Sequence, residues 1–148
     1  MAQAAQLIQT LQLTTPPDRT LLVVGDINSD PRDTILPVPK ELQPAVGVAA
    51  IVPPYLLFTN PYFIGGQFTD AWTRRAWPQP GFTCCQDEDL SNAKSVLYER
   101  IDMIFSATAP KRVIGPFLLG TTPWEKTWPP RFGVWPSDHG AVIATLQF

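Results

Sequence analysis

The chain carries little charge and no excess of either sign. Only 16% of its 148 residues are charged, below the roughly 25% of average domains, and 11 Lys and Arg stand against 13 Asp and Glu. Without a positive field, the chain lacks the long-range attraction behind tight non-specific nucleic-acid binding. Any contact with nucleic acid is therefore expected to be local.

Cysteine and long apolar runs are also scarce. The only cysteines, Cys84 and Cys85, are adjacent and would point to opposite faces of a strand, so the sequence predicts free thiols and matches no zinc spacing. No apolar run reaches the roughly 18 residues of a membrane span, and the first residues lack a signal-peptide pattern. We expect a cytoplasmic chain by default and no membrane span, although a secreted parent trimmed of its signal would look the same.

Proline, by contrast, is abundant: 17 of 148 residues, about twice the usual share. The length and the 45% hydrophobic content fit one globular domain over residues 1–148. Prolines interrupt every candidate element from Pro31 to Pro61, where we expect at most one or two short helical turns.

Hydrophobic periodicity predicts one N-terminal helix followed by strands. From Ala2 to Gln12, apolar residues recur at helical spacing. Apolar or alternating segments predict four strands: Leu21 to Val24, Leu97 to Ala107, Arg112 to Leu119 and Ala141 to Phe148. One helix with several strands indicates a layered α/β or α+β sandwich.

Three polar clusters lie on these strands or at their ends: Gly25-Asp26-Ile27-Asn28, Arg100-Ile101-Asp102 and Ser137-Asp138-His139. Strand ends are where ligand sites form in open sheets. Each cluster alone has an ordinary structural interpretation as a turn cap, a solvated ion pair or a surface histidine. Together and in this order they indicate a site.

The same clusters, with Gly81-Phe82-Thr83, are similar to the GDxN, GxT, RxD and SDH motifs of the endonuclease/exonuclease/phosphatase superfamily, the fold of DNase I and exonuclease III. The resemblance covers nearly all of this chain but only the second half of a usual family member. It implies half of a four-layer αββα DNase I-like fold.

The resemblance also implies catalytic roles. Asp26 would hold and deprotonate the attacking water, and Asn28 would donate its amide to a phosphate oxygen. His139 would stabilise the charge that develops on phosphorus, with Asp102 holding its imidazole in one tautomer.

Further roles concern metal and substrate. Asp26 and Asp138 would be ligands of Mg²⁺ or Mn²⁺, which prefer oxygen donors. Thr83 and Ser137 would bind phosphate or support the loops. Arg100, which shares a strand face with Asp102, would be structural and neutralised by that carboxylate.

The resemblance does not extend to the first half of a family member, which contributes an Asn and the principal metal-binding Glu. Glu99 would face away from the site and would not replace that Glu. One half alone would also leave one face of its sheet in water. We therefore expect a partner, either a second copy in a homodimer or a complementary chain carrying the first half.

Aromatic residues crowd the loop from Thr121 to Pro136, namely Trp124, Trp128, Phe132 and Trp135. They would stack on a base, a sugar or a lipid group, or the loop would pack on itself.

The function expected from the resemblance is metal-dependent phosphodiester hydrolysis by attack of water on phosphorus, with DNA as the leading substrate. Lipid head-group phosphodiesters, as in sphingomyelinases, and phosphomonoesters remain open. The alternative is a catalytically incomplete half-domain that binds phosphate without turnover.

Overall fold

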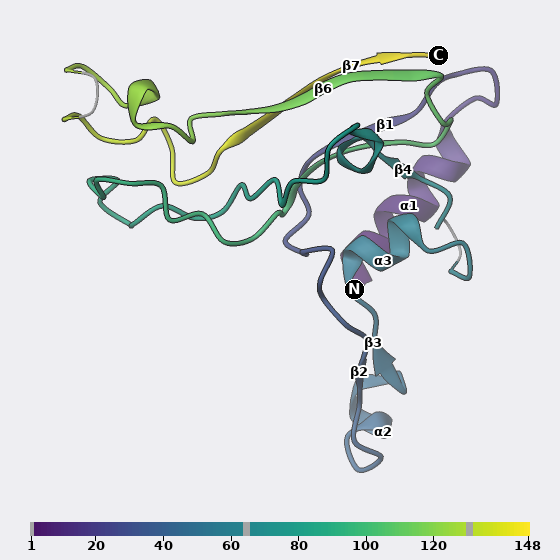
Figure 1. Cartoon of the computed structure of the whole chain (residues 1–148). Helices are drawn as coiled ribbons and strands as arrows, with labels where there is room; N and C mark the ends of the chain where they lie inside the picture. The colour runs from purple at the N-terminus through teal and green to yellow at the C-terminus, as the bar shows by residue number, and fades with distance from the viewer. Residues whose placement is uncertain (1, 64–65, 130–131) are drawn as a thin grey trace.

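A computed structural model describes residues 2–63, 66–129 and 132–148 of the chain (Figure 1). Its short helices and small antiparallel sheets form a mixed α/β architecture, compatible with the α+β class. Among these residues, no helix has both the length and the apolar character needed to cross a membrane.

The elements follow one another along the chain in this order: α1 (Ala2–Thr14), β1 (Leu22–Asp26), β2 (Leu36–Pro37), α2 (Gln43–Val46), β3 (Ala50–Ile51), α3 (Pro54–Thr59), β4 (Thr69–Asp70), the 3-10 helix η1 (Ala71–Arg74), β5 (Asp102–Ser106), β6 (Arg112–Leu119), the 3-10 helix η2 (Pro123–Glu125) and β7 (Ala141–Gln147). The expected N-terminal helix and the expected strands near β1, β6 and β7 are therefore present. Local periodicity was a sufficient signal for these elements.

The strands do not form the single sheet that the sequence suggested. Hydrogen bonds join them into a sheet of order β1-β5-β4, a β6-β7 pair and a small β2-β3 pair, all antiparallel. The strand expected from Leu97 begins only at Asp102, because Cys84 bonds to the backbone of residues 98 and 99. β7 lies against β5 without a ladder between them.

One face of the β1-β5-β4 sheet is covered by α1 and α3, and the core lies between them (Figure 1). Phe105 of β5 is fully buried and stacks on Phe58 of α3 with ring centroids 4.9 Å apart. Ile8 of α1 and Met103 of β5 are buried in the same cluster. Alternation along β5 directs Met103 and Phe105 into this core.

On the opposite face of the sheet, β7 lies against β5, whereas the alternate side chains of β1 are exposed; we call this side the open face. Leu22 and Val24 of β1 alternate with the core residue Val23 and are 44% and 66% exposed. Register places Asp26 opposite Asp102 and Val24 opposite Ile104, and paired residues share a face. The open face therefore carries apolar side chains and two carboxylates.

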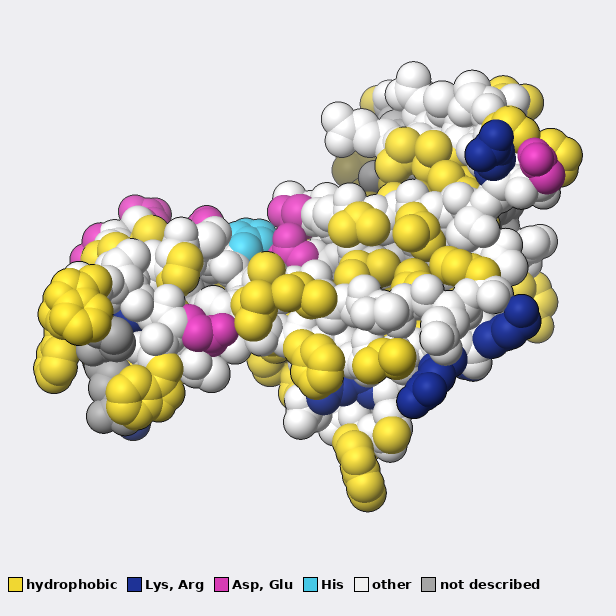
Figure 2. Space-filling view, turned by 90° about the horizontal axis from the view of Figure 1, so that it is seen from above, with side chains coloured by type: hydrophobic (Ala, Val, Ile, Leu, Met, Phe, Trp, Pro, Cys, Tyr) yellow, Lys and Arg dark blue, Asp and Glu magenta, His cyan; other side chains and the backbone are white. Residues whose placement is uncertain are grey.

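The β6-β7 pair exposes an apolar face as well, made by Ile114, Phe117, Leu119 and Ile143, which are 42–59% exposed. Figure 2 shows apolar side chains gathered on the side of the molecule where β6 and β7 lie in Figure 1. The proline-rich segment does not cover them, because β2, β3 and α2 project away from the body (Figure 1).

A buried ion pair joins β4 to the segment before β5. The Arg100 guanidinium lies 2.8 Å from Asp70, with side chains 7% and 2% exposed. Tyr55 donates its hydroxyl to the same carboxylate at 3.0 Å, and the backbone N–H of Trp72 donates to it at 2.9 Å. Burial, together with the charge of Asp70, raises the pKa of Tyr55 to about 12, so the phenol remains a donor.

This pair predicts an asymmetric effect of substitutions on stability. Asp70→Asn keeps the shape but leaves Arg100 charged and buried without a counter-ion, so we expect a loss of about 3–5 kcal/mol. Tyr55→Phe removes one hydrogen bond to a charged group and should cost about 1.5–3 kcal/mol. Urea unfolding measures both, and an Asp70→Asn variant as stable as Tyr55→Phe would contradict this role of Asp70.

Candidate functional site

The first part of the site is the end of β1 and the turn after it. Gly25 has a φ of 147°, a backbone conformation that favours glycine, and Asp26 follows it on the open face. The Asp26 carboxylate accepts the backbone N–H of Asn28 at 2.7 Å, and both residues are exposed. A pocket of about 380 Å³ borders them.

The loop beyond this turn is tied to the segment before β5 through Asp30. Its carboxylate accepts the backbone N–H of Arg100 at 2.7 Å and the Nε–H of Arg32 at 2.7 Å. Burial would raise the pKa of Asp30, but these hydrogen bonds and the charge of Arg32 outweigh it and lower the pKa. Asp30 thus fixes the start of the loop.

The second part of the site depends on the segment 83–86, which bridges the approaches to β5 and β7. The hydroxyl of Thr83 accepts the N–H of Ile101 at 3.2 Å and that of Asp102 at 3.1 Å. The Thr83 carbonyl accepts the N–H of Gly140 at 2.7 Å. The backbone around Asp102 and that around His139 are therefore held by the same residue.

Asp102 and His139 meet across this bridge. The His139 Nδ1 lies 2.8 Å from the Asp102 Oδ2, and the side chains are 25% and 24% exposed. The backbone N–H of His139 donates to the Ser137 hydroxyl at 3.1 Å, and that hydroxyl donates to Asp138 at 3.2 Å. These contacts hold the His139 ring with Nδ1 on Asp102, so a second partner of the ring must contact Nε2.

Carboxylates set the protonation of His139. Burial alone would lower its pKa, but the hydrogen bond and charge of Asp102, with the charges of Asp138 and Asp26, raise the pKa above its usual 6.5. At a given pH, a larger fraction of the His139 ring is therefore charged than of an unperturbed imidazole. Figure 2 shows the histidine at the surface with acidic side chains beside it.

Most of the residues expected in the site therefore lie together. Asp26, Asp102 and Asp138 all act on His139, and Asn28 is bonded to Asp26. Thr83 is the exception among the expected substrate-binding residues: it is 0% exposed and its hydroxyl holds backbone, so its contacts are those of a loop support.

Arg100 differs from the expectation. It is not neutralised by Asp102, because its guanidinium pairs with Asp70. Strand alternation could not reveal this, since residues before Asp102 lie outside β5 and Asp70 is distant in sequence. Asp102 is consequently left for His139.

The cysteines also differ from the expectation. Cys84 and Cys85 are joined by a disulfide rather than being free thiols. The Sγ of Cys85 lies 3.8 Å from the Nε2 of His139, the nitrogen not used by Asp102. Sequence reasoning missed this contact, because the two residues are 54 positions apart.

The donors for a hard cation are few. Within the described ranges, the only group of three or more His, Cys, Asp and Glu whose ligand atoms lie within 4.8 Å is Cys84, Cys85 and His139. Asp26 and Asp138, the ligands expected for Mg²⁺ or Mn²⁺, do not belong to this group.

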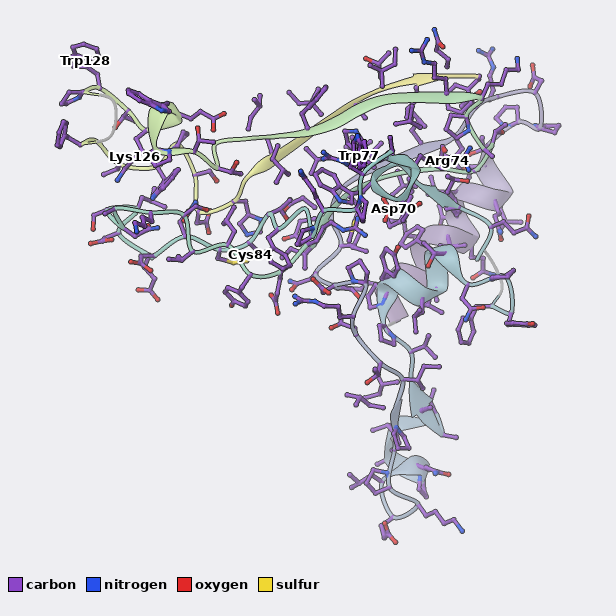
Figure 3. The ribbon with its side chains drawn as sticks, in the orientation of Figure 1. Asp70, Arg74, Trp77, Cys84, Lys126 and Trp128 are labelled. Atoms are coloured by element: carbon purple, nitrogen blue, oxygen red, sulfur yellow. A yellow bond between two sulfur atoms is a disulfide. The ribbon has the colours of Figure 1, made fainter. Side chains whose placement is uncertain are left out.

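The tryptophans of the aromatic loop differ in burial. Trp135 is 1% exposed and donates its Nε1–H to the carbonyl of Asn92 at 2.8 Å, so this part of the loop packs against the chain. Trp124 and Trp128 are 64% and 86% exposed. Figure 3 places Trp128 at the outer end of the loop, away from Cys84.

Comparisons with protein-family models, with curated proteins and with solved structures each return no match.

The geometry predicts how the single histidine titrates. Asp102→Asn removes the hydrogen bond and charge that contribute most to the raised pKa, so the pKa of His139 should fall. Asp138→Asn should lower it less. The His139 ring resonances in an NMR titration measure both, and they need no assignment among several histidines because the chain has only one.

The raised pKa of His139 also makes the stability of the fold depend on pH. Because the folded-state pKa is raised, protonated His139 stabilises the fold below pH 6.5, and this contribution is lost as pH rises through the folded-state value. An Asp102→Asn variant with an unchanged His139 pKa would show that the 2.8 Å contact does not govern the protonation.

Proposed function

We propose that the chain is a phosphodiester hydrolase of the endonuclease/exonuclease/phosphatase type, with DNA as the leading substrate. The observation that supports it best is the Asp102–His139 pair at 2.8 Å, with Asp26 opposite Asp102 on the neighbouring strand. Carboxylates from three of the motifs that resemble that superfamily, Asp26, Asp102 and Asp138, raise the pKa of His139.

The proposed reaction is attack of water on phosphorus with breakage of one P–O ester bond. Asp26 accepts a hydrogen bond from the water and takes its proton. Among the residues that the structure describes, Asp26 uses only the backbone N–H of Asn28, so the side-chain amide of Asn28 would donate to a phosphate oxygen. Mg²⁺, when bound, would add positive charge next to the non-bridging oxygens.

His139 is the group proposed to stabilise the transition state. Its Nδ1 is engaged by Asp102, so Nε2 is the atom that faces the substrate. The raised pKa keeps a larger fraction of the ring positively charged near neutral pH, which favours contact with the negative phosphoryl group. Asp102 is a positioning residue that acts through this ring.

A second candidate function is phosphate binding without turnover. It is favoured by the lack of three closely spaced carboxylates among the residues that the structure describes. Hydrolysis of plasmid DNA and of bis(p-nitrophenyl) phosphate, with Mg²⁺ and after chelation, separates the two. Turnover lost on chelation supports the enzyme, and phosphate binding without turnover supports the alternative.

We further propose a homodimer, whose second copy covers the open face and the exposed side of the β6-β7 pair. At about 25 cal/mol per Å², leaving Leu22, Val24 and Phe117 in water costs several kcal/mol. The partner that a purified sample of this chain always contains is a second copy of itself. Asp26 lies on the same face as Val24, so a copy bound there would border the site. A complementary chain is the other outcome.

The catalytic prediction concerns His139 and Asp102. His139→Ala should lower kcat/KM by roughly 10²-fold or more, the usual scale for such groups. Because Asp102 acts through His139, adding Asp102→Ala to His139→Ala should reduce activity hardly further.

The control is Lys40→Ala, an exposed side chain in the segment between β2 and α2, which should keep full activity. A loss of less than tenfold in His139→Ala would refute the catalytic role. Independent, multiplicative losses in the double variant would mean that Asp102 acts elsewhere.

The assembly prediction concerns Phe117, which is 59% exposed on β6. Phe117→Lys should convert a dimer to a monomer in light scattering at micromolar concentration, because a charge would be buried in an apolar interface. Tyr62→Lys is the matched control, since Tyr62 is 92% exposed and lies beyond α3. A stable wild-type monomer of 16.4 kDa would end the dimer proposal.

A further inference from the structure

Two sulfur atoms and an imidazole nitrogen come together beside the proposed hydrolytic residues. Cys84, Cys85 and His139 each offer one ligand atom, and these atoms all lie within 4.8 Å of one another. We call them the Cys84–Cys85–His139 cluster. Cys84 is 3% exposed, whereas Cys85 and His139 are partly exposed, so the cluster is open to solvent on one side.

Backbone pairing on both sides holds the cluster in place. Cys84 forms antiparallel bridges with Glu99 and with His139, and its N–H donates to the Glu99 carbonyl at 3.0 Å. The N–H of Gln86 donates to the carbonyl of Asp138 at 2.8 Å. The sulfur-bearing segment is thus fixed against the backbone that carries the imidazole.

The imidazole is oriented as metal-binding histidines are. Nδ1 contacts Asp102 at 2.8 Å, and Nε2 faces the Cys85 Sγ at 3.8 Å. Metal-ligating histidines almost always place their other nitrogen on a carboxylate, a carbonyl or water, which fixes the ring and raises its basicity. Asp102 already supplies that support.

We propose that, once the Cys84–Cys85 disulfide is reduced, the cluster binds one Zn²⁺ through both thiolates and the His139 Nε2. A phosphine reductant and one water convert the disulfide to two thiols and a phosphine oxide. The two thiols then release two protons as they bind the ion. Water occupies the fourth position, as in open zinc sites.

The spacing of the Cys85 sulfur and the imidazole nitrogen fits zinc. With Zn–S near 2.3 Å and Zn–N near 2.0–2.1 Å, two ligands of a tetrahedral site lie about 3.5 Å apart. The Cys85 Sγ and His139 Nε2 are 3.8 Å apart. Thiolates are soft ligands that select zinc over Mg²⁺, which prefers oxygen. The cluster is therefore distinct in chemistry from the Asp26 and Asp138 carboxylates.

Zinc at this cluster would occupy the nitrogen that the hydrolytic proposal assigns to phosphate. Provided that proposal holds, Zn²⁺ inhibits hydrolysis under reducing conditions and not when the disulfide is intact. The zinc site itself does not depend on hydrolysis, since it rests on the types of the three ligands and on the spacing of Cys85 and His139.

The test is a titration of the full chain with Zn²⁺, with and without a phosphine reductant and without substrate. We expect one equivalent bound by the reduced chain and none by the oxidised chain. Cys85→Ser and His139→Ala should each weaken binding at least tenfold, and Asp102→Asn, a second-layer change, roughly 10- to 100-fold. Glu88→Gln, an exposed acidic position in the next loop, should bind as the parent chain does.

Co²⁺ provides a readout that needs no variant. The reduced parent chain with Co²⁺ should show thiolate-to-metal charge-transfer absorption together with the bands of a tetrahedral ion. A reduced chain that binds no zinc, or that binds it equally in Cys85→Ser, would overturn the inference. Zinc binding in a chain without hydrolytic activity would leave it standing and refute only the hydrolase proposal.

Discussion

The candidate site depends on one buried side chain, Thr83. Its hydroxyl accepts two backbone donors at the start of β5, and its carbonyl accepts a third before β7. Three N–H groups from two distant segments therefore converge on a residue that is 0% exposed. A buried N–H without a partner costs about 1–3 kcal/mol, which makes this arrangement hard to rearrange locally. The contact between Asp102 and His139 is a consequence, because both side chains leave backbone that Thr83 holds.

A division of charge near β5 supports the same site. Arg100 and Asp102 are two positions apart, yet Arg100 is buried against Asp70 and its backbone N–H is bound by Asp30. Had Arg100 paired with Asp102, that carboxylate would have been neutralised. The pKa of His139 would then have lost the interaction that raises it most. The buried ion pair therefore leaves Asp102 available to charge the imidazole.

Local periodicity was enough to predict α1, β1, β6 and β7, since each presents an apolar pattern that needs no knowledge of its neighbours. Pairing was not predictable in the same way. The division into separate sheets and the late start of β5 arise from bonds between distant segments, such as those of Cys84 with residue 99. The candidate site residues were predicted because their types form ordered motifs, and loop support was one of the two roles expected for Thr83. The sulfur beside His139 has no such local signal.

The two nitrogens of His139 have unlike neighbours, and this limits what the site can do at one time. Nδ1 is held by a carboxylate, so every ligand of the ring must approach Nε2, which already faces sulfur. A disulfide sulfur is a weak acceptor and leaves that nitrogen available to a phosphate oxygen. A thiolate is a far stronger partner for a proton or a soft metal ion, so it would compete for the same atom. The oxidation state of Cys84 and Cys85 would therefore decide whether the Nε2 of the single histidine contacts phosphate or binds a metal ion.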